Sequence, residues 1–356
     1  MPAIVVLVMA FVPFVGNMFV SNKDLIDNRT LFEKPVRFST DFSEEWEAYY
    51  NDTFAWRKTL VKRYLKYQEK LKLNTDKFFH GLDDWMFYDS AKTSDGNTLI
   101  DYKGELVFSD ADLQNMVSGI KKAQDFYGAK GIKYMILAAP NKENIYPEYM
   151  PLHWQKARVS DKSRTDRAIE YIRENLKVEI VNPKESLFAW KEKLSYPLYF
   201  KRDTHWNKIG GYAAYVEMLK GMKNIGLWVW AKPLHNSMIK ETGNIRGDMD
   251  SDWEEIDYEV TYLPNVETKK VFEREDRNVT IYETSNSPLT ETALIISDSF
   301  MGNMKPYVTK LFRKTIIIRR KSKTYENIEE DINEHKPNIV IDQVVERYFN
   351  KLMKYN

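Results

Sequence analysis

The sequence has no cysteine, and histidine is scarce, with 5 among 356 residues. Without cysteine the chain can form no disulfide, no thiolate zinc site and no cysteine nucleophile. The histidines, at positions 80, 153, 205, 235 and 335, show no spacing typical of metal ligands, so we predict no metal site. The cellular compartment stays open, because an exported protein can also lack cysteine.

An excess of charge of either sign is also missing. The 53 basic and 52 acidic residues leave a net charge of +1, so no overall field draws the chain to nucleic acid. We therefore expect no nucleic-acid partner. The hydrophobic share of 43% is enough for a packed core, and the length allows one large domain with appendages or two domains.

Residues 1–20 form an apolar run, M-P-A-I-V-V-L-V-M-A-F-V-P-F-V-G-N-M-F-V. At about 1.5 Å per residue, a helix of this length crosses a hydrocarbon core. We predict a signal anchor or signal peptide that attaches the chain to a membrane, with an exported body. No Lys or Arg precedes the run and Pro13 interrupts it, so a helix buried in the soluble fold is the alternative. Residues 21–42, with Pro35 and no clean period, are predicted to form a tether.

From residue 43 to the end the sequence alternates between helical and strand patterns. Helical patterns fall at 43–74, 110–129, 162–176, 207–222, from about 300, and 325–335; strand patterns fall at 80–88, 133–140, 178–183, 293–298, 314–320 and 338–342. This alternation favours an α/β fold with a mainly parallel sheet flanked by helices. Within one domain of residues 43–356, the alternating runs of 229–292 predict an inserted lobe, β-rich or irregular. In such sheets ligands bind at the carboxyl ends of the strands.

Ser299 follows one of these strand patterns. The run A-L-I-I-S-D-S-F (293–300) is apolar, then polar, and then enters a helix, which places Ser299 at a strand-to-helix turn. A nucleophile benefits there, because the helix N-terminus offers free amide groups and partial positive charge to an oxyanion. The alternative is that Ser297, Asp298 or Ser299 caps the helix.

Asp203 and His205 lie in the motif D-T-H-W (203–206), just before another helix. One residue separates them, so on an extended segment both side chains point the same way. The carboxylate could then fix the imidazole tautomer while the other ring nitrogen takes a proton from a hydroxyl. A structural histidine, with Asp203 paired to Arg202, is the alternative. Because both motifs fall at strand ends, we predict a triad of Ser299, His205 and Asp203.

With these motifs the chain resembles the alginate O-acetyltransferases of the AlgJ and AlgX type, whose catalytic domain is a rearranged SGNH-hydrolase-like domain. D-T-H-W and the later D-S-F carry the specific part of the likeness, and the order Asp, His, Ser fits the family. The supporting stretches are E-A-Y-Y-N-D-T-F-A-W-R (47–57), G-L-D-D-W-M-F (81–87), A-A-P-N-K-E-N-I-Y-P-E-Y-M-P (138–151), S-D-S-F-M-G-N (297–303) and V-V-E-R-Y (344–348).

The resemblance implies transfer of acetyl groups to hydroxyls of a polysaccharide outside the cytoplasm. Ser299 would accept the acetyl group, His205 would be the base and Asp203 would orient it. Asn303 matches the family's site asparagine and would help hold the oxyanion or the acceptor, whereas Ser297 stands where the family often has glycine. Nothing resembles an acetyl-CoA site and we expect no cofactor; the resemblance implies a membrane acyltransferase of the MBOAT class as acetyl donor.

Further side chains are candidates for the cleft. Lys142 and Tyr146 follow a strand end, and Arg347 either lines the cleft or pairs with Glu346. Aromatic residues near the motifs could stack on sugar rings or belong to the core: Trp206, Tyr212, Trp228, Trp230 and Trp253. Two other functions stay open, a hydrolase in which water resolves the acyl-enzyme and a membrane-tethered glycan-binding protein with an idle site.

Overall fold

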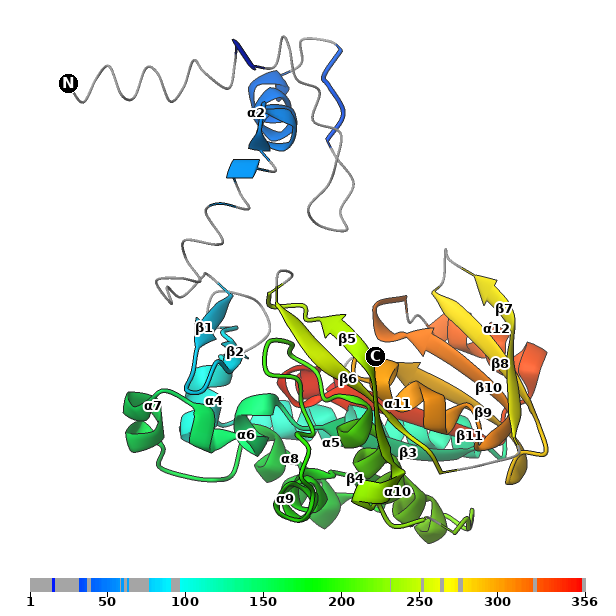
Figure 1. Ribbon diagram of the computed structural model, residues 1–356. Coiled ribbons are helices and arrows are strands. Elements are labelled where there is room, and N and C mark those ends of the chain that lie inside the picture. The colour runs from blue at the N-terminus through cyan, green and yellow to red at the C-terminus, as the bar shows by residue number, and fades with distance from the viewer. Residues whose placement is uncertain are drawn as a thin grey trace. The chain divides into compact units, whose positions relative to one another are not determined.

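The computed structural model describes residues 15–16, 32–36, 40–57, 59–60, 63, 77–90, 97–230, 232–250, 253–262, 266–274, 278–322 and 325–353. The chain divides into two compact units, Met1–Thr75 and Asp76–Asn356 (Figure 1). The predicted apolar run lies outside the described residues except for 15–16, and of the predicted tether only 32–36 and 40–42 are described. No helix among the described residues combines the length and apolar character that a membrane crossing needs.

The first unit contains helix α2 (Phe42–Thr53). Its aromatic residues recur at helical spacing, and the rings of Phe42 and Trp46 stack with centroids 6.0 Å apart. Asp52 is buried, and its carboxylate accepts a hydrogen bond of 3.2 Å from the amide of Phe32. The helical prediction for 43–74 is confirmed over α2, and much of its remainder lies outside the described residues.

The second unit is built on a seven-stranded sheet with the order β4-β3-β11-β9-β10-β8-β7. Its strands are β3 (Lys133–Ala139), β4 (Glu179–Val181), β7 (Glu267–Arg274), β8 (Val279–Ser285), β9 (Leu289–Ser297), β10 (Phe312–Arg319) and β11 (Ile339–Val345). The five strands from β4 to β10 pair in parallel, whereas β8 and β7 add antiparallel at one edge.

The sheet is therefore mixed: five of its seven strands pair in parallel, as predicted, and the two strands at one edge are antiparallel. The period-2 patterns of the predicted 229–292 lobe do form strands, but half of them extend the main sheet. Only β5 (Ile239–Arg246) and β6 (Glu254–Val260) form a hairpin of their own. A second small hairpin joins β1 (Phe78–His80) and β2 (Met86–Tyr88).

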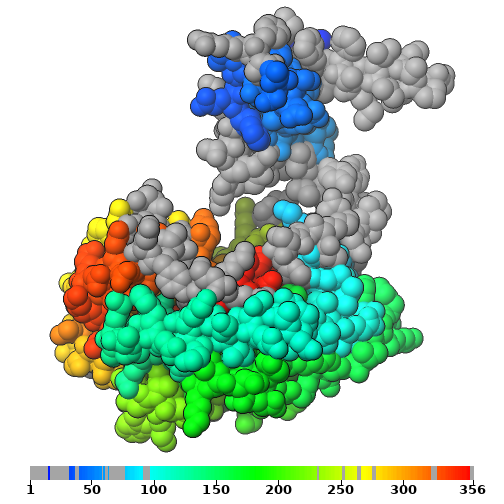
Figure 2. Space-filling model, turned by 180° about the vertical axis from the view of Figure 1, so that it is seen from behind, coloured from blue at the N-terminus to red at the C-terminus, as the bar shows by residue number. Residues whose placement is uncertain are grey.

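Helices cover both faces of the sheet. They are α4 (Thr98–Lys103), α5 (Asp110–Gly128), α6 (Lys142–Ile145), α7 (Leu152–Ala157), α8 (Arg164–Asn175), α9 (Lys184–Lys193), α10 (Lys208–Asn224), α11 (Met301–Val308) and α12 (Tyr325–His335), with short 3₁₀ helices η1 (Pro147–Tyr149), η2 (Asn236–Met238), η3 (Arg320–Ser322) and η4 (Glu346–Met353). Apolar residues of α5, α8 and α12 pack on one face and those of α10 and α11 on the other. Figure 2 shows α5 in teal and α12 in orange-red on the first face.

The central strands are buried on both faces, so their sequences are nearly continuous apolar runs. In β3, Met135 and Leu137 join the α10 side of the core, and Tyr134 and Ile136 join the α5 side. The alternation follows from the opposite directions of successive side chains on a strand. The rigid sheet brings the carboxyl ends of β3, β9 and β11 to one edge, where the polar motifs lie.

Candidate active site

Ser299 lies in the turn between β9 and α11, as the sequence predicts, and its side chain is exposed. The preceding residue holds the turn. The Asp298 carboxylate accepts hydrogen bonds from the amide of Val345 (2.5 Å), from Nε2 of Gln343 (2.9 Å) and from the amide of Phe300 (2.9 Å). Asp298 therefore ties the serine turn to the end of β11.

The residues 200–206 form a second turn, which we call the base turn, directly before α10. Asn207 caps this helix, since its Oδ1 accepts from the amides of Ile209 (2.9 Å) and Gly210 (3.1 Å). Trp206 is fully buried, and its indole N–H donates to the carbonyl of Phe300 at 2.8 Å. The base turn is thereby joined to the serine turn.

The two turns bring the three predicted residues together. Nε2 of His205 lies 2.7 Å from Oγ of Ser299, and Nδ1 lies 2.6 Å from Oδ1 of Asp203. The same Asp203 oxygen accepts from the His205 amide at 2.8 Å. These distances are those of a hydrogen-bonded series in which the carboxylate orients the imidazole and the imidazole faces the hydroxyl.

The electrostatics of Asp203 suit an ionised carboxylate. Burial by itself raises the pKa of Asp203, but the hydrogen bonds and positive charge of His205, with an amide bond from Asp248, bring the pKa below its ordinary value. An ionised Asp203 stabilises a protonated imidazole. The geometry therefore allows His205 to take a proton from Ser299.

Lys142, predicted to line the cleft, lies instead beneath the base turn. Its side chain is 2% exposed, and its Nζ donates to the carbonyls of Phe200 (3.2 Å), Lys201 (2.9 Å) and Asp203 (2.8 Å). Burial lowers the pKa of Lys142 to about 8. An ammonium group has three donors and no acceptor, so three converging carbonyls satisfy it.

The other predicted cleft residues also make internal contacts. The side-chain Nδ2 of Asn303 donates to the carbonyl of Trp206 at 2.6 Å, and the hydroxyl of Tyr146 accepts from the backbone amide of Leu198 at 2.8 Å. Arg347 donates to Oδ1 of Asn141 at 3.1 Å, with its guanidinium 5.5 Å from the ring centre of Phe300. Asn303 and Arg347 thus lie next to the two turns, and Tyr146 supports the segment before them.

Acidic residues lie buried behind the site. Glu346 accepts from the amide of Asn141 (2.8 Å) and from Nδ2 of Asn144 (2.9 Å). Burial raises the pKa of Glu143 to about 8, and burial with the charge of Glu346 raises that of Asp101 to about 7. These contacts join the loop after β3 to the end of β11.

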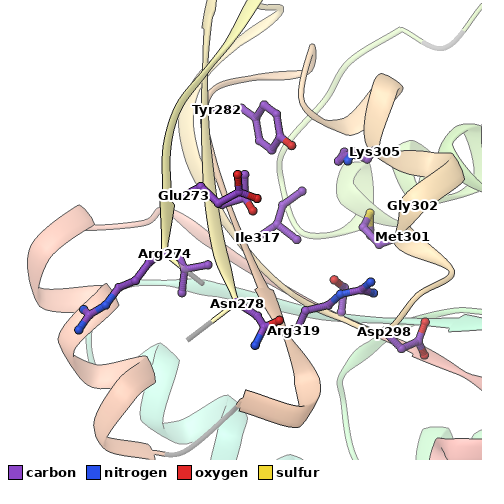
Figure 3. Close-up of a pocket in the computed structure, with 13 residues that line it drawn as sticks. Glu273, Arg274, Asn278, Tyr282, Asp298, Met301, Gly302, Lys305, Ile317 and Arg319 are labelled. Atoms are coloured by element: carbon purple, nitrogen blue, oxygen red, sulfur yellow. The ribbon is translucent and has the colours of Figure 1, made fainter. Parts of the chain in front are cut away.

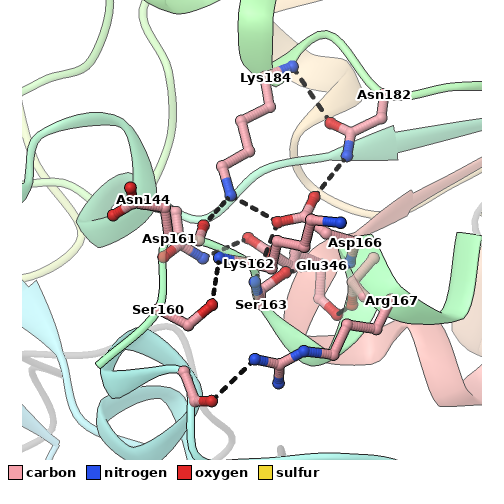
Figure 4. A network of polar contacts seen from close by, with 12 residues as sticks. Asn144, Ser160, Asp161, Lys162, Ser163, Asp166, Arg167, Asn182, Lys184 and Glu346 are labelled. Atoms are coloured by element: carbon pink, nitrogen blue, oxygen red, sulfur yellow. Dashed lines mark hydrogen bonds and ion pairs between the residues drawn. The ribbon is translucent and has the colours of Figure 1, made fainter. Parts of the chain in front are cut away.

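A polar network at the start of α8 flanks this acidic group (Figure 4). Asp166 accepts from Nζ of Lys184 (2.5 Å) and from Nδ2 of Asn182 (2.9 Å). Ser163 and Asp166 also form a reciprocal cap of the helix. The network anchors α8 to the end of β4, so the carboxyl edge of the sheet is braced on this side.

Several supporting residues were not predicted from sequence. The carboxylate of Glu255, from β6, accepts from the amides of Lys201 (2.6 Å) and Arg202 (2.5 Å). Asp248 lies beside His205, its Oδ2 3.5 Å from Nδ1. Neither residue stands in a motif; the only signal was the acidic character of the 248–255 stretch, which alone does not specify a partner.

Asp203, His205 and Asp248 are also the one group among the described residues whose ligand atoms, within 4.8 Å of one another, could hold a metal ion. Two ligands of one ion at about 2.1 Å in tetrahedral geometry lie roughly 3.4 Å apart. The 2.6 Å between Nδ1 of His205 and Oδ1 of Asp203 is shorter and matches a hydrogen bond. We therefore assign the pair as hydrogen-bonded.

A cavity of about 480 Å³ opens beside the serine turn (Figure 3). Its walls are formed by the end of β9, by the start of α11, by β10, and by β7 and β8 at the edge of the sheet. Asp298, Lys305 and Arg319 are among the residues that line it. The hydroxyl of Ser297 is buried in this wall and has no hydrogen-bond partner among the described residues. Of the aromatic candidates, Trp206 and Tyr212 are buried, whereas Trp228 and Trp230 are exposed.

The chain belongs to the family described as SGNH hydrolase-like domain, acetyltransferase AlgX, whose model matches residues 79–288. The matched range includes Asp203 and His205 and ends before Ser299. This confirms the resemblance inferred from the motifs. No curated protein sequence matches the chain at a significant level.

Solved structures also resemble this chain. Bacillus cereus PatB1 has a TM-score of 0.54 at 15% identity, over 79% of this chain and 100% of PatB1. A DHHW family protein from Eubacterium siraeum has 0.51 at 15%, over 70% and 90% of the two chains. The O-acetyltransferase domain of Pseudomonas putida AlgJ has 0.48 at 12%, over 77% and 92%. At these identities the first two likenesses show a shared fold.

Proposed function

We propose that the protein is an O-acetyltransferase that moves an acetyl group, through an acyl-enzyme on Ser299, to hydroxyls of a cell-surface or exported polysaccharide. The observation that carries the proposal is the series from Asp203 Oδ1 to His205 Nδ1 (2.6 Å) and from His205 Nε2 to Ser299 Oγ (2.7 Å). Membership of the AlgX acetyltransferase family supports acetyl as the group transferred.

In the first half of the reaction, Oγ of Ser299 attacks the carbonyl carbon of the acetyl donor while His205 Nε2 takes the hydroxyl proton. The tetrahedral intermediate collapses, the bond to the leaving group breaks, and His205 returns the proton to that group. The product is an acetyl ester on Ser299. Asp203 stays ionised throughout and stabilises the imidazolium.

In the second half, a sugar hydroxyl gives its proton to His205 and attacks the acetyl ester. The new ester bond forms on the sugar, and Oγ of Ser299 leaves with the proton from His205. The oxyanion of each intermediate is expected at the start of α11, near the positive end of the helix dipole. The cavity of about 480 Å³ is lined by Asp298 and Met301, on either side of Ser299 in the chain, and not by the three triad residues; we infer that it holds a part of the acceptor away from the reacting hydroxyl.

The setting of the reaction is also part of the proposal. We infer an extracytoplasmic location, with a membrane acyltransferase of the MBOAT class as donor and the apolar residues 1–20 as attachment to the membrane.

Intact mass spectrometry after incubation with an activated acetyl ester, with and without candidate glycans, tests the proposal. We expect a gain of one acetyl group on Ser299 that is discharged faster by glycan than by water. Ser299→Ala should not gain it, and Ser299→Ala or His205→Ala should lower the transfer rate about 10⁴- to 10⁶-fold. Discharge by water regardless of glycan would indicate an esterase, and a folded protein that never labels would indicate a glycan-binding protein.

A further inference from the structure

The connection between β5 and β6 is packed directly against the base turn. A Cβ atom at Gly247 would lie 2.2 Å from the carbonyl oxygen of Arg202, so only glycine allows this approach. The amide of Met249 donates to the same carbonyl at 3.2 Å. The next side chain along this connection, Asp248, is thereby fixed at the turn.

Asp248 contacts all three residues of the D-T-H segment. Its amide donates to Oδ2 of Asp203 at 2.9 Å. Its carboxylate accepts from the amide of Thr204 at 2.7 Å and from the Thr204 hydroxyl at 2.6 Å. Its Oδ2 then lies 3.5 Å from Nδ1 of His205. Two carboxylates therefore face the same edge of the imidazole.

We propose that Asp248 is a positioning residue for the Asp203–His205 pair, whose amide orients the Asp203 carboxylate and whose own carboxylate adds a second negative charge beside the imidazolium. Oδ1 of Asp203 serves His205, so the bond from Asp248 to Oδ2 fixes rotation of the carboxylate about Cβ–Cγ. The proposal rests on the role of His205 as the base.

Other charged groups surround the base turn at greater distance from the ring. Among the described residues, only Asp203 and Asp248 place a carboxylate oxygen within 4.0 Å of a His205 nitrogen. The remaining charges act on the backbone of the turn, pair with each other or lie beyond the Phe300 ring: Lys142, Glu255, Arg202 with Asp250, and Arg347. A change at Asp248 therefore alters the field at the ring with the other charges in place.

Asp248→Asn tests the proposal, because asparagine keeps the size and one oxygen for the Thr204 amide but removes the charge. In the full chain with ¹⁵N-labelled histidine, the titration midpoint of the His205 ring should move about 0.5 to 1.5 pH units lower, since the imidazolium loses a nearby opposite charge. The acidic limb of the kcat/KM profile should move the same way. We expect kcat to fall about 10- to 100-fold with KM unchanged.

Glu254→Gln is the matched control, because it removes an exposed carboxylate that pairs with Arg246 on the same hairpin. Glu254→Gln should leave the titration midpoint of His205 and the rate unchanged. Asp248→Glu keeps the charge, so its midpoint and its rate should lie between those of Asp248→Asn and those of wild type. If Asp248→Asn does not fold, Thr204→Val is the second variant: it removes the hydroxyl bond to Oδ2 of Asp248, keeps the amide bond to Oδ1, and should still move the midpoint away from that of the control. A midpoint equal to that of the control overturns the proposal. The titration needs no turnover, so its outcome is separate from failure to form an acyl-enzyme.

Discussion

The serine turn and the base turn are joined by the His205–Ser299 and Trp206–Phe300 hydrogen bonds, yet different parts of the chain hold them. The serine turn is held by Asp298, which bonds to the adjoining residue Phe300 and to the end of the neighbouring strand β11. The base turn is held by charged side chains from distant segments, Lys142 from α6 and Glu255 from β6. The serine turn is therefore held by the parallel sheet itself, whereas the base turn is held by side chains from α6 and from the β5–β6 hairpin.

This difference separates stability from activity. The contacts of Asp298 close the central sheet, so their loss should be felt by the whole second unit. The contacts of the base turn fix a short segment that lies outside the sheet, so loosening it leaves the sheet intact. A displacement of about 1 Å of a catalytic group can still cost about 100-fold in rate. We therefore expect changes at the serine turn to lower the stability of the second unit, and changes at the base turn to slow catalysis.

Asp298→Ala should have the largest effect on stability. The substitution removes the carboxylate that accepts three hydrogen bonds, and the backbone amide of Val345 loses its acceptor. We expect the free energy of unfolding to fall by about 3 to 5 kcal/mol, measured by urea titration. Asp125→Ala, which removes an exposed ion pair with Lys121 on α5, is the control and should cost under about 0.5 kcal/mol. Equal stability of the two variants would remove the distinction between the turns.

Lys142→Met should show the opposite behaviour. Methionine fills a similar volume but leaves the carbonyls of Phe200, Lys201 and Asp203 without the ammonium donor. We expect kcat to fall about 100-fold, with KM unchanged because the side chain does not face the substrate. Lys191→Met is the control, since Lys191 donates to the carbonyl of Ile145 on the neighbouring helix. A rise in KM alone would instead place Lys142 at the acceptor.

The sequence predicted the sheet strands β3, β4, β9, β10 and β11 and the helices between them, because continuous apolar runs and helical periods are local signals. It also predicted the meeting of Ser299, His205 and Asp203, although only Ser299 follows a sheet strand: Asp203 and His205 lie in a turn before α10 and not at the strand end that the sequence predicted. It did not predict that β8 pairs with β10 and β7 with β8, because alternation marks a strand without naming its partner. The contacts of Lys142 and Asp248 were likewise missed, since side-chain bonds to a distant backbone leave no period.

Glu143 allows a test of the acidic group behind the site. Burial raises the pKa of Glu143 to about 8, so between about pH 4.5 and 8 the folded chain holds a proton that the unfolded chain has released. Its contribution to stability is complete below about pH 4.5 and is lost as the pH rises through 8. Glu143→Gln stays neutral, so between pH 5 and pH 9 its stability relative to wild type should rise by about 2 to 5 kcal/mol.

Urea titrations at pH 5, 7 and 9 measure this difference. Glu185→Gln, at an exposed position of α9, is the matched control and should show the pH dependence of wild type. If the stability of Glu143→Gln shows the same pH dependence as wild type, Glu143 is ionised in the folded protein at neutral pH. Our assignment of Glu143 as protonated would then be wrong.

Ser297→Ala should have the smallest effect and sharpens the comparison at the serine turn itself. The Ser297 hydroxyl is buried without a partner among the described residues, and removing an unsatisfied buried hydroxyl leaves stability unchanged or raises it by about 0.5 to 1 kcal/mol. Ser297 is also one of the residues that line the cavity next to the serine turn. A higher KM for glycan with an unchanged melting temperature would mean that an acceptor hydroxyl supplies the missing partner. An unchanged KM would mean that the acceptor makes no contact with Ser297 and binds, if at all, to the other residues of the cavity.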